Sequence, residues 1–354
     1  MTHVIPPGVT FELPALPRQL ATGRHPAIDR LEPLHDQWMS RNYPFPTEDA
    51  LSAFLSQRSA LWTAVTYPAT DEARFHDLSR LTSFLFAFDD LFLHKGPDTA
   101  ADIKRIFTDM LTVLGGGTAT TVYGTALADI WHDMAGRMPA RQRQRLRAAT
   151  EDFGRGCFTE MPSRAPGAVL DLTSYTTLRL EQSLAAWVYF ILTEYAAGVD
   201  LPDDTLAQLR PVHWACAEHL LFSNDLFSFR TEHFAGDHVN AVCVLLADGA
   251  TLQQAINQIA DLISAKEQQV TDMLRAVRAS RLGADRATAA YLHHLEYVIS
   301  GNLEQARFAP RYHGTSGFIH QPIDGGTVIL HADRTGHRSL PGAAVQAPPS
   351  NRPG

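Results

Sequence analysis

Apolar residues recur at spacings of three and four along most of the chain, from about Asp49 to Tyr312. This period is typical of amphipathic helices, and the stretches are long enough to form them. Short polar or Gly/Pro breaks separate the stretches, for example at Tyr67-Pro68 and at Gly115-Gly116-Gly117. Strand patterns, which alternate apolar and polar residues around Asn-Gly or Asp-Gly turns, are nearly absent. The pattern therefore predicts an all-α domain of about ten helices.

The two ends of the chain lack this helical period. Residues 1–20 contain prolines at positions 6, 7, 14 and 17, and we expect them to form an extended arm that lies over the domain. After residue 312 the chain is rich in Gly, Pro, His and Ser and has no apolar period. We expect residues 313–354 to be a disordered tail. No shift in composition divides residues 21–312, so they are expected to form one helical domain.

The composition argues against several classes of protein. The 354 residues are 45% hydrophobic and 19% charged, as in an ordinary globular protein. A net charge of -8 argues against a nucleic-acid partner, because such proteins usually carry a clustered basic excess. The most apolar run, residues 184–192, is much shorter than the roughly 20 residues that span a bilayer. With no membrane span and no secretory signal at the N-terminus, we expect a cytoplasmic protein.

The chain contains three cysteines, Cys157, Cys216 and Cys243, which lie far apart within apolar segments. An odd number of widely separated cysteines favours neither a disulfide framework nor a zinc site. We therefore expect all three to be buried free thiols.

The strongest local signal is the segment from Asn224 to Glu232, which lies late in a long apolar helical stretch. Asn224, Ser228 and Glu232 stand at positions i, i+4 and i+8, so one helix face presents an amide, a hydroxyl and a carboxylate in a line. Magnesium prefers oxygen ligands and is often held jointly by a few side chains and substrate phosphates. The alternative is the solvated face of an amphipathic helix. Taken alone, the three positions fit both interpretations.

A second candidate is the pair Asp89-Asp90, at the end of an aromatic-rich helical run that begins at Ser83. Carboxylates beside apolar surface are costly unless a cation or hydrogen bonds compensate them. Neighbouring helix positions differ by about 100° in direction, so only one of the pair can point squarely into a cavity. We assign that position to Asp89 and a supporting one to Asp90. An isolated Asp-Asp pair is otherwise typical of a helix end or turn, as at Asp203-Asp204.

Together with the pair Arg311-Tyr312 near the end of the last helix, these motifs resemble class I terpene synthases of the bacterial type. The motifs occur in the family's order and at its approximate separations. The resemblance implies a single-domain class I terpenoid synthase bundle, all-α, that surrounds a central active-site cavity. It also implies that the aspartate motif and the Asn/Ser/Glu triad face each other across the mouth of that cavity and hold three Mg²⁺ ions against the substrate diphosphate. The metal ligands would be Asp89, Asp90, Asn224, Ser228 and Glu232.

The resemblance implies further residues around the diphosphate. Arg179 lies 45 residues before the first residue of the triad, close to the family's spacing for a diphosphate-sensing arginine. Ser183 falls at the effector position, where the helix breaks and a backbone carbonyl faces the departing group. Gln182 stands at the linker position, which is more usually an aspartate. Arg311 and Tyr312 would donate hydrogen bonds to the diphosphate.

The sequence departs from the family pattern at other positions as well. The third acidic residue of the aspartate motif is missing, since Leu93 and His94 stand where it is commonly found. The basic residue normally before the triad glutamate is Thr231, and the adjacent Arg230 is the candidate to reach the diphosphate instead. Gln305 replaces a tryptophan often found six residues before the arginine of the Arg-Tyr pair. These changes bear on turnover more than on fold.

The implied function is the Mg²⁺-dependent ionisation of an allylic prenyl diphosphate and cyclisation of the carbocation to a terpene hydrocarbon or alcohol. Farnesyl diphosphate is the expected substrate because it is the commonest in the family, with geranyl or geranylgeranyl diphosphate as alternatives. Aromatic faces stabilise such a cation without reacting with it, and apolar walls exclude water. For each candidate taken singly, ordinary packing in the core is the favoured interpretation. The candidates are Trp62, Phe84, Phe86, Phe88, Trp187 and Phe222.

Two other interpretations stay open. A chain-elongating prenyltransferase shares the fold and the magnesium chemistry, but it should carry a second Asp-rich motif where this chain has the Asn/Ser/Glu pattern. A non-catalytic relative that binds prenyl ligands is favoured by the missing third acid and by Gln305. In each case the expected partner is a small prenyl compound, and the chain is expected to be a monomer or a homodimer.

Overall fold

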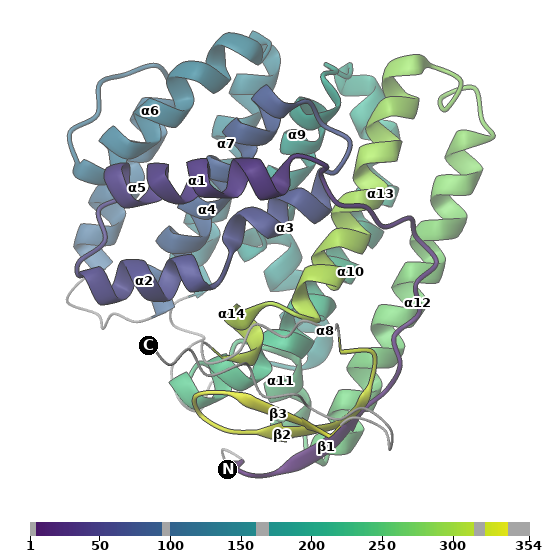
Figure 1. Ribbon diagram of the computed structural model, residues 1–354. Coiled ribbons are helices and arrows are strands. Elements are labelled where there is room, and N and C mark those ends of the chain that lie inside the picture. The colour runs from purple at the N-terminus through teal and green to yellow at the C-terminus, as the bar shows by residue number, and fades with distance from the viewer. Residues whose placement is uncertain (1–4, 94–99, 161–169, 315–322, 339–354) are drawn as a thin grey trace, which may run out of the picture.

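The computed structural model describes residues 5–93, 100–160, 170–314 and 323–338. These ranges are predominantly helical, and the helices pack around one large hydrophobic core (Figure 1), so the predicted all-α class is confirmed. Within the described ranges, no helix has the length and apolar character that crossing a membrane requires. The helices before residue 170 are α1 (Ile28–Asn42), α2 (Glu48–Ser56), α3 (Ser59–Thr66), α4 (Glu72–Leu93), α5 (Ala100–Leu114), α6 (Val122–Arg137) and α7 (Ala140–Glu160).

The helices that follow carry most of the candidate site. They begin with α8, which continues directly into η3, a short π-helix with wider turns than an α-helix. The bounds are α8 (Leu172–Leu178), η3 (Arg179–Ser183), α9 (Ala186–Ala197), α10 (Asp203–Ala235), α11 (Ala241–Ala247), α12 (Leu252–Arg278), α13 (Arg286–Ala306) and α14 (Pro310–His313).

Local signals in the sequence set where these helices begin and end. α12 begins with a capping box, in which Thr251 and Gln254 each accept a hydrogen bond from the other's backbone amide. Gly236 caps the C-terminus of α10, and its φ of 79° lies in the left-handed region that glycine adopts without strain. The chain can therefore turn sharply after α10 and enter α11.

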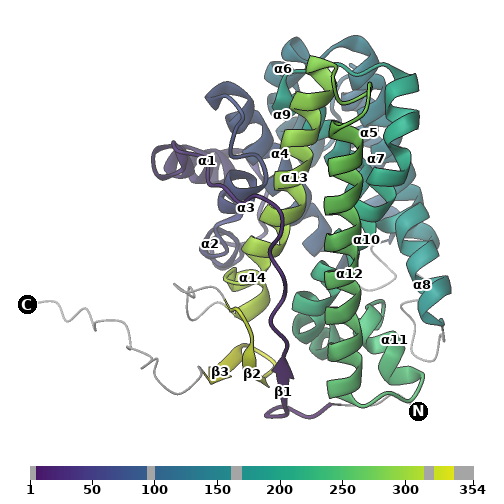
Figure 2. The same cartoon turned by 90° about the vertical axis from the view of Figure 1, so that its right-hand side faces the viewer.

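α10 connects the parts of the bundle that form the candidate site. It packs against α12 and α13, and these three helices run side by side in Figure 2. α10 also contacts α9 and η3, and α11 and α14 pack against it as well. α4 in turn packs against α9. Side chains of α4, η3, α10 and α14 can therefore reach one shared interior space.

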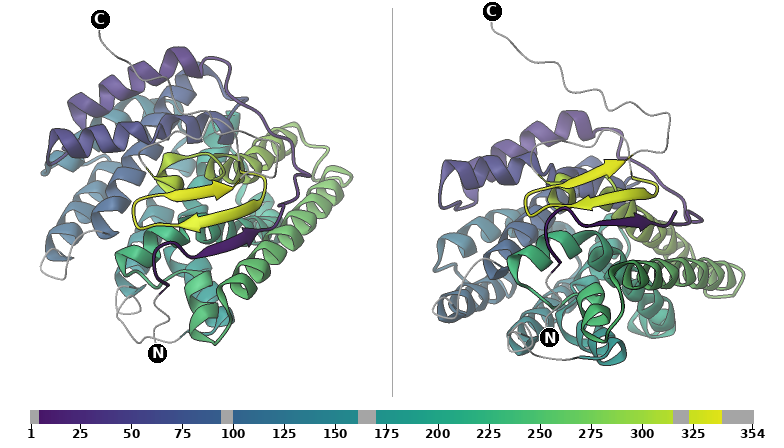
Figure 3. Two further views of the ribbon diagram at one scale, coloured as in Figure 1. Left: turned by 60° about the horizontal axis from the view of Figure 1, so that its bottom comes forward. Right: turned by 90° about the horizontal axis from the view of Figure 1, so that it is seen from below.

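The C-terminal segment contradicts part of the sequence prediction. Within the segment predicted to be disordered, β2 (Gly326–Leu330) and β3 (Thr335–Arg338) form an antiparallel hairpin, and β1 (Thr10–Leu13) pairs with β2. The sheet lies across one end of the bundle, beside α11 and α14 (Figures 1 and 3). Its strands are short, and β1 finds its partner at the other end of the chain, so no local sequence pattern announces the sheet. Residues 315–322 and 339–354 of the predicted tail lie outside the described residues.

The segment predicted to be an extended arm lies along α12 (Figure 2). The backbone amide of Glu12 donates a hydrogen bond to Gln253 Oε1 at 2.8 Å, and the amide of Leu20 donates to Glu267 Oε1 at 3.3 Å. The side chain of Leu20 is buried in the main core. Backbone hydrogen bonds to helix side chains thus hold the arm in place before α1 begins.

Candidate active site

The Asn/Ser/Glu triad lies on the wall of a small polar cavity, which we call the polar compartment. Its volume is about 90 Å³. The triad shares one face because α10 runs without a break through all three positions. Other side chains come from α4, α7, η3, α14 and the loop after α10. The lining residues are Asp89, Cys157, Arg179, Asn224, Ser228, Glu232, Asp237, Val239, Arg311 and Tyr312.

A second cavity of about 160 Å³ adjoins the polar compartment, and we call it the apolar cavity. Five residues line both spaces: Asp89, Arg179, Asn224, Arg311 and Tyr312. The remaining wall is mostly apolar. It consists of Trp62, Leu85, Phe86, Phe88, Phe153, Leu184, Ala185, Ala186, Val188, Tyr189 and Leu220, with Thr150 and Asn302 as polar members. The two cavities together fit a ligand with an anionic head group and an apolar chain.

On the α4 side of the polar compartment, both carboxylates of the aspartate pair lie close to Arg311. Asp90 Oδ1 is 2.8 Å from Arg311 Nη1, and Asp89 Oδ2 is 3.6 Å from Nη2. Burial disfavours the charged guanidinium, but the two carboxylates outweigh it and hold the pKa of Arg311 above its ordinary value. Asp89 lines both cavities and Asp90 lines neither. This agrees with the prediction that only one of the pair can point into a cavity, because neighbouring helix positions differ by about 100°.

On the α10 side, Arg179 lowers the pKa of Glu232 but only partly offsets the effect of burial and of the neighbouring carboxylates. Ser228 Oγ is buried and has no hydrogen-bond partner among the described residues. Burial, together with the nearby carboxylates Asp225 and Asp237, raises the pKa of Glu232 to about 8. A hydroxyl without a partner and a carboxyl that resists ionisation next to an amide oxygen fit a divalent cation with oxygen ligands. The donor set of the triad therefore fits magnesium.

Asn240, which the sequence analysis missed, holds the triad glutamate in position. Its side-chain oxygen caps the N-terminus of α11 by accepting from Val242 N at 2.8 Å. Its amide group donates to Glu232 Oε2 and to the Asp225 backbone carbonyl, both at 2.8 Å. An asparagine just before a short apolar helix is an ordinary capping signal, and nothing in the sequence indicates the second contact.

Asp225, the residue after the first triad position, joins α10 to two neighbouring helices. Its carboxylate accepts a hydrogen bond from the Tyr175 hydroxyl at 2.6 Å and from the Ala241 amide at 2.9 Å. Tyr175 is fully buried in α8, one helical turn before Arg179. The Tyr175–Asp225 hydrogen bond therefore fixes the segment that carries Arg179 relative to the triad.

The helix breaks where the resemblance places the effector segment. η3 ends at Ser183, Leu184 is extended, and the Leu184 amide donates to the Arg179 carbonyl at 2.8 Å. Single π-helical turns of this kind often occur at functional sites. Arg179 lines both cavities. The backbone of Ser183 belongs to η3, and its side chain lies outside the described part of the structure, as does that of Gln182.

Arg230 does not lie where the sequence analysis predicted. Its guanidinium is buried on another face of α10, where it donates to the Tyr312 carbonyl at 3.2 Å and the Ala332 carbonyl at 2.8 Å. Positions two residues apart on a helix point about 200° apart, so Arg230 turns away from Ser228. Arg230 lines neither the polar compartment nor the apolar cavity, and it connects α10 to α14 and the C-terminal hairpin. Thr231 Oγ1 accepts a third hydrogen bond from Arg230 at 3.0 Å.

The aromatic candidates divide into two groups. Trp62, Phe86 and Phe88 line the apolar cavity as expected. Phe84 and Phe222 are buried in the core, and Trp187 packs against neighbouring aromatics; none of these three lines the cavity. Several other wall residues were not singled out by the sequence analysis, among them Thr150, Phe153, Tyr189 and Asn302.

The remaining departures from the family pattern have mixed outcomes. Leu93 ends α4, but its side chain and all of His94 lie outside the described residues. Gln305 is buried in α13, and it is not among the residues that line the apolar cavity. None of the three cysteines, which all lie within the described ranges, forms a disulfide. Cys216 and Cys243 are buried as predicted, whereas Cys157 is half-buried and lines the polar compartment.

The helical bundle thus surrounds an apolar cavity that is bordered by carboxylate, amide, hydroxyl and guanidinium groups. Such a site suits a ligand with an anionic head group and a hydrocarbon chain. Residues 80–269 match the family described as terpene synthase family 2, C-terminal metal binding. The match covers more than half of the chain and includes the aspartate pair and the triad. The chain belongs to this family of metal-binding terpene synthases, which confirms the resemblance seen in the motifs.

Relatives and solved structures agree with this assignment. The chain is 26% identical over 301 residues to microbial terpene synthase-like protein 13 of Selaginella moellendorffii, covering 82% of this chain and 84% of the relative. It is 26% identical over 312 residues to 4-epi-cubebol synthase of Streptosporangium roseum, covering 85% and 92%. The crystal structure of aristolochene synthase from Penicillium roqueforti superposes with a TM-score of 0.71 at 22% identity, covering 83% of this chain and 99% of that one. The fold is therefore that of the class I terpene synthases.

Proposed function

We propose that this protein is a terpene cyclase that ionises farnesyl diphosphate with the help of Mg²⁺ and cyclises the resulting carbocation to a hydrocarbon or an alcohol. The observation that carries the proposal is the border shared by the two cavities. Charged and polar side chains from four separate elements meet there, at the mouth of an aromatic-lined space. That border lies where the bond between the hydrocarbon chain and the diphosphate would have to break.

The candidate metal ligands are Asp89 on one side and Asn224, Ser228 and Glu232 on the other. Asp90 has a supporting place, because it contacts Arg311 and not the cavities. When bound, magnesium ions, three by the pattern of the family, would supply positive charge that stabilises the leaving diphosphate. A pKa of about 8 means that Glu232 has to release a proton to become a ligand at neutral pH.

Arg179, Arg311 and Tyr312 are the candidates to bind the diphosphate directly. A guanidinium stays protonated at any physiological pH and can contact two phosphate oxygens at once. Burial raises the pKa of Tyr312, so its hydroxyl keeps its proton and remains a hydrogen-bond donor. In the structure Tyr312 Oη accepts a hydrogen bond from the Asn224 amide at 3.3 Å, which keeps both groups at the border. The carbonyl of Ser183 is the candidate to face the departing group.

The apolar cavity has two tasks in this proposal. Its side chains exclude water that would quench the carbocation, and the faces of Trp62, Phe86 and Phe88 stabilise positive charge without reacting. The substrate is inferred from a relative: the name of the Streptosporangium roseum enzyme states that it cyclises (2E,6E)-farnesyl diphosphate. Geranyl and geranylgeranyl diphosphates remain the alternatives for this chain.

The direct test is to incubate purified protein with Mg²⁺ and each of the three prenyl diphosphates, and to analyse the organic extract by gas chromatography. We expect a cyclic product from farnesyl diphosphate. An elongated diphosphate, formed only when isopentenyl diphosphate is added, would identify a prenyltransferase instead. Binding of all three substrates without any product would identify a non-catalytic relative, which the absence of the third acid and Gln305 favour.

A further inference from the structure

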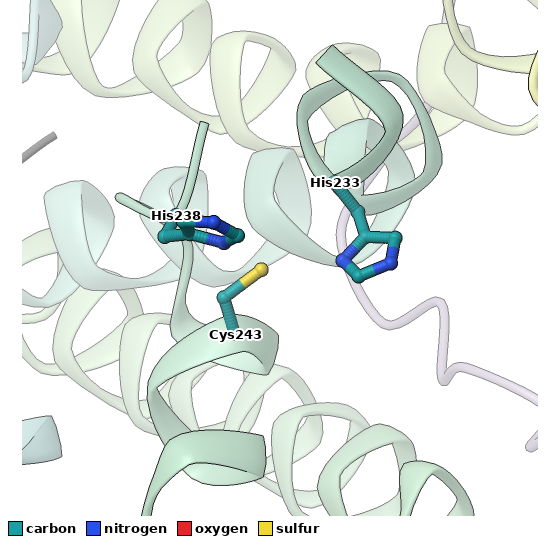
Figure 4. Close-up of side chains that lie close together, drawn as sticks. All are labelled: His233, His238 and Cys243. Atoms are coloured by element: carbon teal, nitrogen blue, oxygen red, sulfur yellow. The ribbon is translucent and has the colours of Figure 1, made fainter. Parts of the chain in front are cut away.

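Three side chains with nitrogen and sulfur ligand atoms converge beyond the end of α10. His233 lies in the last turn of α10, His238 in the loop that follows, and Cys243 in α11 (Figure 4). Each offers one ligand atom, and these atoms all lie within 4.8 Å of one another. None of the three residues lines the polar compartment, although His233 directly follows Glu232. The cluster is therefore separate from the proposed magnesium ligands.

We propose that His233, His238 and Cys243 form a second metal site, selective for a divalent cation of the zinc type. Imidazole nitrogen and thiolate sulfur are the ligands that zinc prefers, whereas magnesium prefers oxygen. The metal displaces the proton of the Cys243 thiol, which passes to solvent. Water would occupy the fourth position.

The three ligand atoms are slightly too far apart to bind one metal ion as they stand. Tetrahedral zinc with bonds of about 2.0–2.3 Å holds its ligand atoms about 3.5 Å apart. The ligand atoms here therefore have to approach by about 1 Å. Both histidines are only partly buried, and His238 belongs to a loop, so their side chains have room to turn. Burial and the nearby carboxylates raise the pKa of the Cys243 thiol, so the metal has to displace a proton there, and the same negative charges attract the cation.

Metal binding at this site has a consequence for the N-terminal arm. His233 Nε2 accepts a hydrogen bond from the Ile5 amide at 3.2 Å. A neutral imidazole has only one unprotonated nitrogen, so His233 cannot accept this hydrogen bond and bind a metal at the same time. The metal would therefore release the Ile5 amide from α10.

Metal binding at this site would also restrict the loop that positions Glu232 in the proposed active site. The loop between α10 and α11 carries His238 and, two residues later, Asn240, whose amide donates to Glu232. A metal that joins His238 and Cys243 to α10 restricts this loop at both ends. The sequence alone favoured an inert Cys243, because its two partner histidines are ordinary residues until the turn at Gly236 brings them together.

The test is to titrate the full chain, freed of metal by a chelator, with Co²⁺ in the presence of excess Mg²⁺. Cobalt reports on zinc sites by its absorption, and only a sulfur ligand gives a sulfur-to-cobalt charge-transfer band. We expect this band to saturate at one equivalent of Co²⁺ and to disappear when Zn²⁺ is added. Cys243→Ser should abolish the band, and His238→Ala should weaken Co²⁺ binding about 10-fold or more.

Matched variants separate this site from others. Cys157→Ser removes the thiol that lines the polar compartment, and His132→Ala removes an exposed histidine of α6; both should keep the band. Hydrogen exchange should slow at residues 237–240 and accelerate at Ile5 when Zn²⁺ binds. Absence of the band from the wild-type protein, or its loss in Cys157→Ser but not in Cys243→Ser, would overturn the proposal. If Cys243→Ser does not fold, His238→Ala carries the test, because His238 is a partly buried loop residue.

Discussion

Both sides of the polar compartment carry oxygen ligands, but the two sides differ in the positive charge and hydrogen bonds that their oxygen atoms receive from the protein. On the α4 side, the Asp89 and Asp90 carboxylates already have Arg311 as a counter-charge. On the α10 side, the Ser228 hydroxyl has no partner among the described residues, and the pKa of Glu232 is raised. From this difference we expect a bound cation to stabilise the α10 side more than the α4 side, whose carboxylates already contact Arg311.

The largest expected effect is on the α10 side. Asn224→Ala or Glu232→Ala removes a proposed metal ligand, and product formation should fall about 1000-fold or more. Circular dichroism should show unchanged helical content, because both positions lie on α10, which is stabilised by its packing against α12 and α13. Turnover retained in both variants would refute the metal assignment.

A smaller effect is expected on the α4 side, and it should differ between the two aspartates. Asp89→Ala should lower kcat/KM about 100-fold, because Asp89 lines both cavities. Asp90→Ala should lower it about 10-fold or less, since Asp90 acts through Arg311. Steady-state kinetics on the two single variants give the comparison, and equal losses would contradict separate roles for the pair.

The hydrogen bond behind the α10 side gives a third prediction. Tyr175→Phe removes a donor from the buried Asp225 carboxylate, and we expect the Mg²⁺ concentration for half-maximal turnover to rise about 10-fold. The matched control is Tyr291→Phe, which removes an equally buried hydroxyl that bonds to His213 at 2.8 Å. Both variants should lose about 1–3 kcal/mol of unfolding free energy, but only Tyr175→Phe should change the magnesium dependence.

The smallest effect on rate is expected inside the apolar cavity, where Asn302 is a polar member of the wall. Its side-chain oxygen accepts a hydrogen bond from Trp62 Nε1 at 3.1 Å, and we expect its amide NH₂ group, as a donor, to position a water molecule in the cavity. We expect the wild-type enzyme to release some alcohol, and Asn302→Leu to shift the product toward hydrocarbon with less than about a 3-fold change in turnover. Gln305→Leu, a buried amide outside the cavity wall, is the control, and gas chromatography should show no such shift.

Sequence reasoning predicted the helices and the triad because both depend on a spacing that one helix fixes. It also selected Asp89 over Asp90 correctly as the cavity-lining residue, although the metal role of Asp89 stays a prediction. The prediction that Arg230 reaches the diphosphate was wrong. Arg230 is two residues after Ser228, and this offset of about 200° directs its side chain to another face of α10. Although Arg230 is adjacent to Thr231 in the sequence, the two positions do not share a helix face.

The sequence could not reveal contacts that join distant elements. The β1–β2 pairing depends on segments at opposite ends of the chain, and short strands have no periodicity to detect. The Tyr175–Asp225 and Asn240–Glu232 hydrogen bonds depend on how α8 and α11 pack against α10. Likewise, Tyr189 and Asn302 line the cavity only because α9 and α13 converge there. These are properties of the tertiary fold and not of any local pattern.

The central claim is that both sides of the compartment bind one metal–diphosphate assembly, and a double-mutant cycle tests it most directly. The Kd of inorganic diphosphate at saturating Mg²⁺ would be measured by calorimetry for the wild-type protein, Asp89→Ala, Asn224→Ala and the double variant. A shared assembly predicts that the two losses in binding free energy are coupled by about 1 kcal/mol or more. Losses that add to within about 0.5 kcal/mol would show that Asp89 and Asn224 act independently, and would contradict the account.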